Sequence, residues 1–126
     1  MPKLVALVDD LMFLSRIREA GRAAGVTVAS ARGAADLVAA ATNGASLVLV
    51  DADSERLPWR EAVAALRALP GLETLPVVAF VSHVRADHAQ AARAAGASQV
   101  LARSAFVEEL PRLVSEAGAS SASDRS

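Results

Sequence analysis

The chain has 126 residues, of which 53% are hydrophobic, a formal net charge of −1 and no cysteine. This length and composition suit one domain with a single core. The charge gives no sign of a strongly basic nucleic-acid surface, and the lack of cysteine excludes disulfides and thiolate chemistry. The chain shows neither a signal peptide nor an apolar run near the roughly 18 residues of a membrane span. We therefore expect a cytoplasmic domain with no membrane or nucleic-acid partner.

Strand-like and helix-like segments alternate along the chain. Short β-branched runs predict buried strands, while apolar residues at helical spacing, ended by glycine or proline, predict helices. In chain order, we predict a strand over 3–8, a helix over 11–24, a strand over 26–29, a helix over 34–42, a strand over 47–50, a helix from Pro58 to Pro70-Gly71, a strand over 77–81, a helix over 86–95, a strand over 99–102 and a helix over 105–117.

Five strands that are each followed by a helix predict a parallel sheet with right-handed crossovers, and hence a three-layer α/β sandwich. Pro111 is expected near the first turns of the last helix, where a missing N–H matters least. We expect the domain to span 1–117. The small polar residues of 118–126 predict a disordered tail or a linker stub.

Acidic residues follow two of the apolar strands directly. Asp9 and Asp10 come after the first strand, Asp51 comes after the third, and Asp53 stands two residues further on. Ligands of open α/β sheets bind beyond the carboxyl ends of the strands, so these acids are expected to lie together. Crowded carboxylates repel each other and are tolerated best around a cation. The pattern therefore predicts a metal and phosphoryl site.

Polar residues also follow the fourth and fifth strands. Ser82 and His83 come after the fourth strand, and Arg103 and Ser104 come after the fifth. A hydroxyl group and a positive charge are suited to phosphoryl oxygens. One of the carboxylates could itself be the nucleophile, as in aspartyl-phosphate chemistry.

Four segments carry a resemblance to a known family over about residues 3–116: LVALVDD at 4–10, LVLVD at 47–51, LPVVAFVS at 75–82 and AAGASQVLAR at 94–103. With them the chain resembles the receiver domains of response regulators in two-component signalling, the CheY-like family. The resemblance implies a flavodoxin-like, doubly wound sheet of five parallel strands in the order 2-1-3-4-5.

The resemblance also implies roles for the residues at the strand ends. Asp51 would be the phospho-acceptor, Ser82 the hydroxyl that follows the phosphoryl group, and Arg103 the residue at the position of the family's lysine. The implied cofactor is Mg²⁺, with Asp9, Asp10, Asp51 and the backbone carbonyl of Asp53 as its ligands. The implied partners are a sensor histidine kinase or phosphotransfer protein and a downstream protein, for a monomer or weak homodimer that is not an enzyme.

The chain departs from the family around this acidic pocket. Arginine and lysine are not interchangeable at a tight site, although arginine can hold a phosphoryl group with two parallel hydrogen bonds. Further departures are Ser104 for a proline, His83 for a small residue, Val100 for an aromatic switch residue, and Glu55 and Trp59 for a proline and a glycine. The surroundings of the pocket and its readout are therefore predicted to be unusual.

Two other functions stay open at this point. A degenerate receiver would keep the fold and act as a protein-binding module without phosphorylation. Alternatively, Asp51-Ala52-Asp53 is similar to the DxD motif of haloacid-dehalogenase-type phosphatases, in which the second aspartate is the acid/base.

Structural roles compete with the functional ones. Asp10 could cap the first helix, and Trp59 is expected to cover the first turn of the third helix. We expect His83 and His88 to be exposed residues rather than a metal-binding pair.

Overall fold

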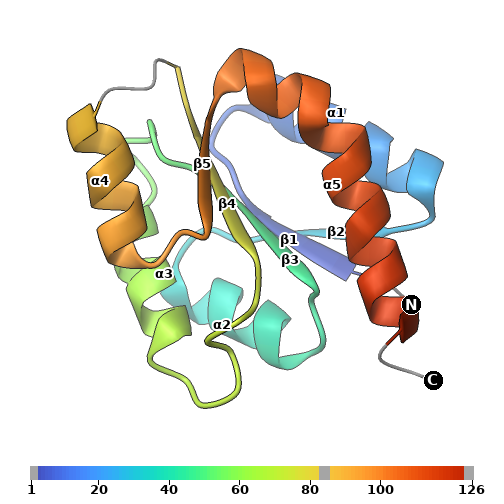
Figure 1. The fold of residues 1–126 in the computed structure, drawn as a ribbon, viewed down its shortest axis with the longest axis horizontal. Helices are drawn as coiled ribbons and strands as arrows, with labels where there is room; N and C mark the ends of the chain where they lie inside the picture. Colours follow the sequence, from blue (N-terminus) through green and yellow to red (C-terminus); the bar gives the residue numbers. More distant parts are fainter. Residues whose placement is uncertain (1–2, 83–85, 124–126) are drawn as a thin grey trace.

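The structure is a computed structural model that describes residues 3–82 and 86–123. Within these residues, five strands alternate with five helices (Figure 1), as the sequence predicts. In chain order the elements are β1 (Lys3–Leu7), α1 (Leu11–Ala24), β2 (Thr27–Ser30), α2 (Ala34–Thr42), β3 (Leu47–Asp51), α3 (Trp59–Arg67), β4 (Val77–Val81), α4 (Ala86–Ala95), β5 (Gln99–Ala102) and α5 (Arg103–Ser123). None of these helices is both long enough and apolar enough to cross a membrane.

The strands form one parallel sheet in the order β2-β1-β3-β4-β5. β1 pairs with β2 on one side and with β3 on the other, and β4 and β5 extend the sheet outward. Helices α1 and α5 cover one face, and α2, α3 and α4 cover the other (Figure 1). This arrangement confirms the predicted three-layer, flavodoxin-like fold. It also brings the carboxyl ends of all five strands to one edge of the sheet.

Two apolar clusters, one on each face of the sheet, hold the layers together. Successive side chains of a strand point to opposite faces. Leu4 and Ala6 of β1 therefore lie in the cluster with α1 and α5, while Val5 and Leu7 lie in the cluster on the other face. Strands β3 and β4 are buried throughout, which explains their uninterrupted apolar sequences.

The ends of α1 confirm the predicted start and stop signals. Asp10 precedes the helix in extended conformation, and its side chain accepts hydrogen bonds from the first turn. Gly25 ends the helix with φ 71°, a left-handed conformation that favours glycine. These two residues fix the length of α1 and hold its first turn next to the carboxyl end of β1.

Strand limits differ from the predictions by one residue where hydrogen bonding, rather than hydrophobicity, sets the end. Val26 is apolar, but its N–H donates to the carbonyl of Gly21 in α1, so β2 begins at Thr27. At the end of β3, the N–H of Ala52 donates to the carbonyl of Phe80, which carries the pairing on to Asp51. Asp51 is therefore the last residue of its strand rather than the first residue of the loop.

The last helix differs most from the prediction. α5 begins at Arg103 and runs to Ser123, so the expected boundary at residue 117 falls inside the helix, and the expected disordered tail is helical as far as the structure describes it. Gly118 does not end the helix, because the glycines with positive φ lie elsewhere, and alanine is a strong helix former. Pro111 lies well inside the helix, beyond its first turns, so the prediction for Pro111 was wrong as well.

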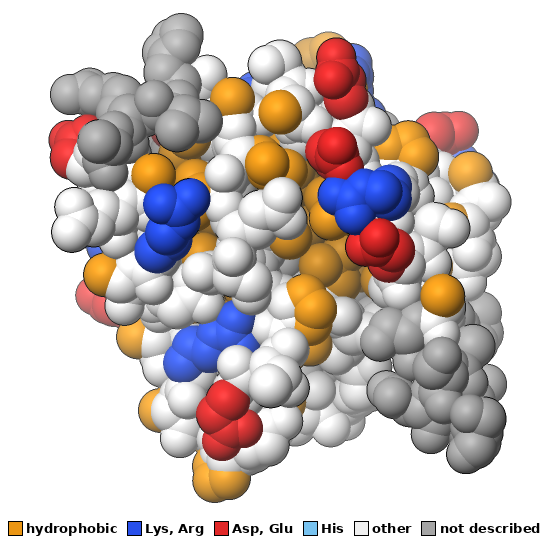
Figure 2. Space-filling view, viewed as in Figure 1, with side chains coloured by type: hydrophobic (Ala, Val, Ile, Leu, Met, Phe, Trp, Pro, Cys, Tyr) orange, Lys and Arg blue, Asp and Glu red, His pale blue; other side chains and the backbone are white. Residues whose placement is uncertain are grey.

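A shallow groove of about 400 Å³ separates α5 from the amino ends of β3, β4 and β5. Apolar side chains line much of it, and Figure 2 shows apolar groups among acidic and basic ones on this face. On α5, Arg112 forms ion pairs with Glu109 and Glu116. The groove lies at the end of the sheet opposite to the strand-end acids.

Candidate functional site

Asp51 is a buried acid at the carboxyl end of β3. Its exposed fraction is only 4%, and among the described residues it is the one buried charged side chain. Burial raises the pKa of the Asp51 carboxyl, because a low-dielectric environment disfavours the charged form. The backbone N–H of Asp53 donates to Asp51 Oδ1 at 3.1 Å and partly offsets this effect. The fold thus holds a poorly solvated carboxylate at the edge where ligands bind.

Asp10 has two roles at the start of α1. Its Oδ1 atom accepts hydrogen bonds from the N–H groups of Met12 at 2.9 Å and Phe13 at 3.1 Å, so the capping interpretation is confirmed. These bonds, above all the one from Phe13, lower the pKa of Asp10. Its Oδ2 atom lies 3.4 Å from Nη1 of Arg103. Asp10 therefore anchors a helix with one oxygen and faces the site with the other.

Asp9 and Arg56 add a second contact between opposite charges. Asp9 Oδ2 lies 3.9 Å from Nε of Arg56, a residue of the loop between β3 and α3. Arg56 was not among the residues predicted for the site. Its place in the polar loop directly after Asp51 was the only signal available. The site therefore carries two arginines where one was expected.

Arg103, the first residue of α5, reaches the site across aromatic rings. Its guanidinium carbon lies 4.8 Å from the centre of the Phe13 ring and 5.6 Å from that of Phe80, within the range of cation–π contact. These two rings and Phe106 pack against one another. Nε of Arg103 is buried without a hydrogen-bond partner, while Nη1 contacts Asp10. A planar guanidinium suits this stacked position better than the ammonium group of a lysine would.

Ser82 and Asp53 are joined directly. The backbone N–H and the hydroxyl of Ser82 both donate to Oδ2 of Asp53. From the resemblance, Ser82 was predicted to contact a phosphoryl group with its hydroxyl, and Asp53 to contact the metal with its backbone carbonyl; a bond between the two residues was not predicted. The pairing depends on how the loop after β3 folds back toward the end of β4, which no spacing in the sequence reveals.

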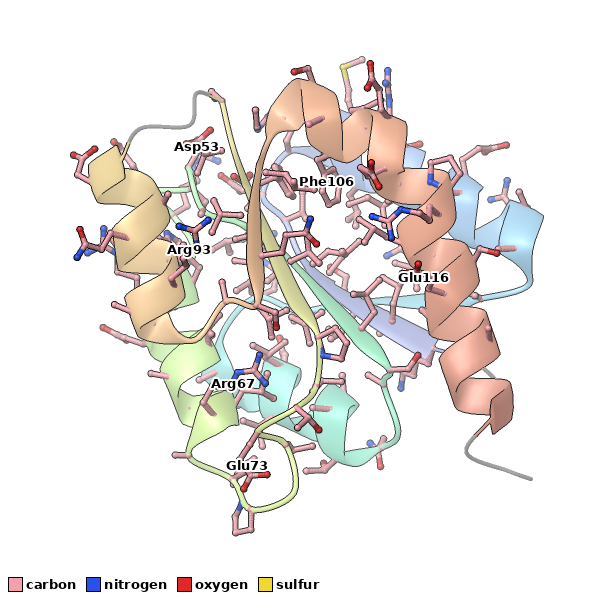
Figure 3. The ribbon with its side chains drawn as sticks, in the orientation of Figure 1. Asp53, Arg67, Glu73, Arg93, Phe106 and Glu116 are labelled. Atoms are coloured by element: carbon pink, nitrogen blue, oxygen red, sulfur yellow. The ribbon has the colours of Figure 1, made fainter. Side chains whose placement is uncertain are left out.

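These residues surround one open cavity of about 370 Å³, lined by Asp9, Asp10, Asp51, Asp53, Ser54, Glu55, Arg56 and Arg103. Figure 3 shows Asp53 at this edge of the sheet. The predicted acids and Arg103 are thus brought together, and Ser82 joins them through Asp53. In the described part of the chain, no three acidic or histidine side chains are grouped closely enough to hold a metal ion by themselves.

The predicted departures from the family have different outcomes. Val100 is buried in the cluster beside α3 and α4. Ser104 lies in the first turn of α5, and Trp59 is buried at the start of α3, as expected. His83 and the side chain of His88 lie outside the described residues, so the predictions about them stay predictions.

Response regulators and receiver domains are among the solved structures that this chain resembles in fold. A response regulator from Hahella chejuensis matches with a TM-score of 0.77 at 20% identity, over 93% of this chain and 95% of that one. A response regulator from Burkholderia multivorans matches at 26% identity with a TM-score of 0.69, over 90% and 94% of the two chains. The receiver domain of the sensor histidine kinase PA1611 from Pseudomonas aeruginosa, solved with a magnesium ion in its active site cleft, matches at 19% identity with a TM-score of 0.70, over 90% and 97%.

The chain thus has the fold of response-regulator receiver domains, and the resemblance seen in the sequence is confirmed at this level. No protein-family model and no curated protein matches the sequence. The similarity is one of structure at low sequence identity, so the roles of individual residues depend on the geometry of the site.

Proposed function

We propose that the chain is a receiver domain of two-component signalling that accepts a phosphoryl group on Asp51 and changes its affinity for a downstream protein. The observation that carries this proposal is the single cavity that is lined by the buried Asp51 carboxylate, four further acids and Arg103. The receiver fold of the chain supports the same function. The phosphoryl donor would be a histidine kinase or a phosphotransfer protein, and the domain would act in the cytoplasm as a monomer or weak homodimer rather than as an enzyme.

The proposed reaction is a direct transfer. A carboxylate oxygen of Asp51 forms a bond to phosphorus, and the bond between phosphorus and the donor's nitrogen breaks. The backbone bond from Asp53 orients the other carboxylate oxygen of Asp51. Arg103 can donate N–H groups to the phosphoryl oxygens, because its Nη1 atom already faces the cavity at Asp10. The phosphoryl group on Asp51 would then lie between Arg103 and the carboxyl ends of the strands.

The donor set also fits Mg²⁺. Magnesium prefers oxygen ligands and is usually held by one or two carboxylates together with phosphate oxygens and water, not by a complete protein cage. Asp10 and Asp51 would supply carboxylates and Asp53 its backbone carbonyl, with Asp9 beside them. When bound, the ion would neutralise the charge that gathers on the phosphoryl oxygens.

One observation favours the second candidate, a binding module that works without phosphorylation. Both groups expected to contact a phosphoryl group already have partners within the chain: Ser82 is bound to Asp53, and Arg103 is bound to Asp10. The phosphatase alternative gains no such support, because its acid/base, Asp53, is the acceptor of both donors of Ser82.

Amide chemical shifts measured with beryllofluoride and Mg²⁺ test the proposal, since beryllofluoride mimics a phosphoryl group on aspartate. We expect saturable shifts around residues 51–53, at Arg103 and in α4. Asp51→Asn should abolish them, whereas Glu61→Gln, a change of an exposed acid on α3, should leave them intact. Without any saturable shift in the wild-type chain, the binding module would be the better function.

A further inference from the structure

Ser82 donates both its backbone N–H and its hydroxyl to one carboxylate. Its backbone N–H and its hydroxyl each reach Oδ2 of Asp53 at 2.5 Å. A serine carries one hydroxyl hydrogen and one amide hydrogen, so neither remains for a second acceptor. Bonds to an ionised carboxylate are roughly twice as strong as those between neutral groups. The end of β4 is thus a small anion-binding position that the chain fills itself.

The anion that fills this position is closely linked to the proposed phospho-acceptor. Asp53 follows Asp51 by two residues, and its own N–H donates to Oδ1 of Asp51. The loop after β3 therefore connects the two carboxylates, with Asp51 held on one side and Ser82 on the other. A new anion placed on Asp51 would arrive beside a carboxylate that already holds the donors of Ser82.

We propose that the Asp53 carboxylate is an internal competitor of the phosphoryl group: it holds Ser82 while Asp51 is unmodified and has to release it when an anion is bound on Asp51. This inference rests on the proposed function and names its regulation. The two anions repel each other and require the same two hydrogens. The exchange is therefore all or none at Ser82, and the strength of the Asp53–Ser82 contact sets how readily a phosphoryl group can engage the end of β4.

The resting contact can be tested without any ligand. We expect the amide proton of Ser82 to shift upfield and to exchange faster with solvent in Asp53→Ala than in the wild-type chain, because its charged acceptor is removed. Glu55→Ala serves as the matched control, since Glu55 is an acid in the same loop that lines the same cavity and has no bond to Ser82. If Asp53→Ala leaves the Ser82 amide unchanged, the proposal is wrong.

The competition itself can be measured with beryllofluoride and Mg²⁺. We expect Asp53→Ala to bind the probe at least about tenfold more tightly, a change of about 1.4 kcal/mol. Glu61→Gln, a change of an exposed acid outside the cavity, should alter the affinity by no more than about twofold, about 0.4 kcal/mol. Glu55→Ala removes a charge from the cavity without freeing Ser82 and should gain less than Asp53→Ala. In a Ser82→Ala background the gain from Asp53→Ala should be smaller, because one of the two contested donors is already missing. Asp53→Asn, which keeps the size of the side chain, should lie between wild type and alanine.

The outcomes separate this inference from the proposed function. A wild-type chain that binds the probe, together with a larger gain in Asp53→Ala than in Glu55→Ala, supports the competition. Equal gains in Asp53→Ala and Glu55→Ala would reduce the effect to general charge and overturn the competition. An unchanged affinity in Asp53→Ala, with normal binding by the wild-type chain, would also overturn it and leave the receiver function standing. If no variant binds the probe, both proposals fail.

Discussion

The two ends of the sheet use polar side chains in different ways (Figure 3). At the amino ends, Arg67 donates to the carbonyl oxygens of Gly96, Leu72 and Glu73. Ser46 likewise donates to backbone carbonyls there. These acceptors belong to the chain itself and cannot leave without unfolding it. The polar groups at this end therefore stabilise the fold.

At the carboxyl ends, side chains pair with one another around a cavity. Asp10 contacts Arg103, Asp9 contacts Arg56, and Asp53 holds Ser82. These contacts join one side chain to another, so we expect each of them to be exchangeable for a contact with a bound anion or cation. One small domain thus contains two kinds of polar network: one is bonded to the backbone, and the other joins side chains around a cavity.

Removal of Arg67 should break the fixed network most severely. Arg67→Ala deletes a side chain that holds three carbonyls and the hydroxyl of Ser98. We expect the free energy of unfolding to fall by about 3 kcal/mol, because a bond to a charged group contributes about 1.5–3 kcal/mol. Urea unfolding followed by circular dichroism measures the change. Arg18→Ala, which removes one exposed bond to a carbonyl, should cost less than about 1 kcal/mol. Similar losses for both variants would contradict the conclusion that the bonds of Arg67 to backbone carbonyls stabilise the fold.

A pair of glycine variants tests how tightly Arg67 is packed. Gly96 and Gly44 both have positive φ, at 124° and 97°, but an added Cβ at Gly96 would lie 2.6 Å from Cγ of Arg67, whereas Gly44 faces open space. We expect Gly44→Ala to cost about 1 kcal/mol from the backbone alone. Gly96→Ala should cost about 2 to 3 kcal/mol, because overlap adds to the same backbone strain. Thermal unfolding measures both variants, and equal losses would show that Arg67 gives way freely.

Asp10 both caps α1 and faces Arg103 in the cavity, and two substitutions can separate these roles. Asp10→Ala removes the cap of α1 and should lower the free energy of unfolding by about 1 kcal/mol. Asp10→Asn keeps an oxygen for the N–H groups of Met12 and Phe13 and should lose less, since asparagine is an equally good cap. Both variants lose the charge that faces Arg103 and should therefore bind Mg²⁺ more weakly. A large loss of stability in Asp10→Asn would show that the ion pair, rather than the cap, stabilises the helix.

Substitution of Asp51 should change the free energy of unfolding least, and it should raise this free energy rather than lower it. The pKa of Asp51 in the folded chain is raised above 3.8 by burial, so the ionised carboxylate opposes folding at neutral pH, and this penalty disappears as the pH falls through the raised pKa. Asp51→Asn should therefore be more stable than wild type at about pH 7, with a gain that vanishes toward about pH 4. Urea unfolding across this range measures it. A variant that is less stable at neutral pH would mean that the charge is better compensated than its burial indicates.

The sequence was sufficient to predict the sheet, because buried parallel strands need apolar runs and each run here is followed by a helical segment. It was also sufficient to bring Asp9, Asp10, Asp51 and Arg103 to one cavity, since the carboxyl ends of parallel strands share an edge.

Other features could not be predicted because they depend on side-chain and loop conformations. The bond from Ser82 to the Asp53 carboxylate requires a loop to fold back on a strand end, and Arg103 lies on rings contributed by α1 and β4. The extension of α5 was missed because small polar residues predict disorder when they are considered without the helix that precedes them.

The buried Trp59 gives the molecule an optical reporter of its own. It is the single tryptophan of a chain that has no tyrosine. The residue is only 7% exposed, the guanidinium of Arg60 lies over its ring, and it lines a pocket together with Asp53. Emission from this one indole therefore reports both the loss of the core and changes in the loop beside the acidic cavity. The variants described above can be compared by fluorescence without any attached label.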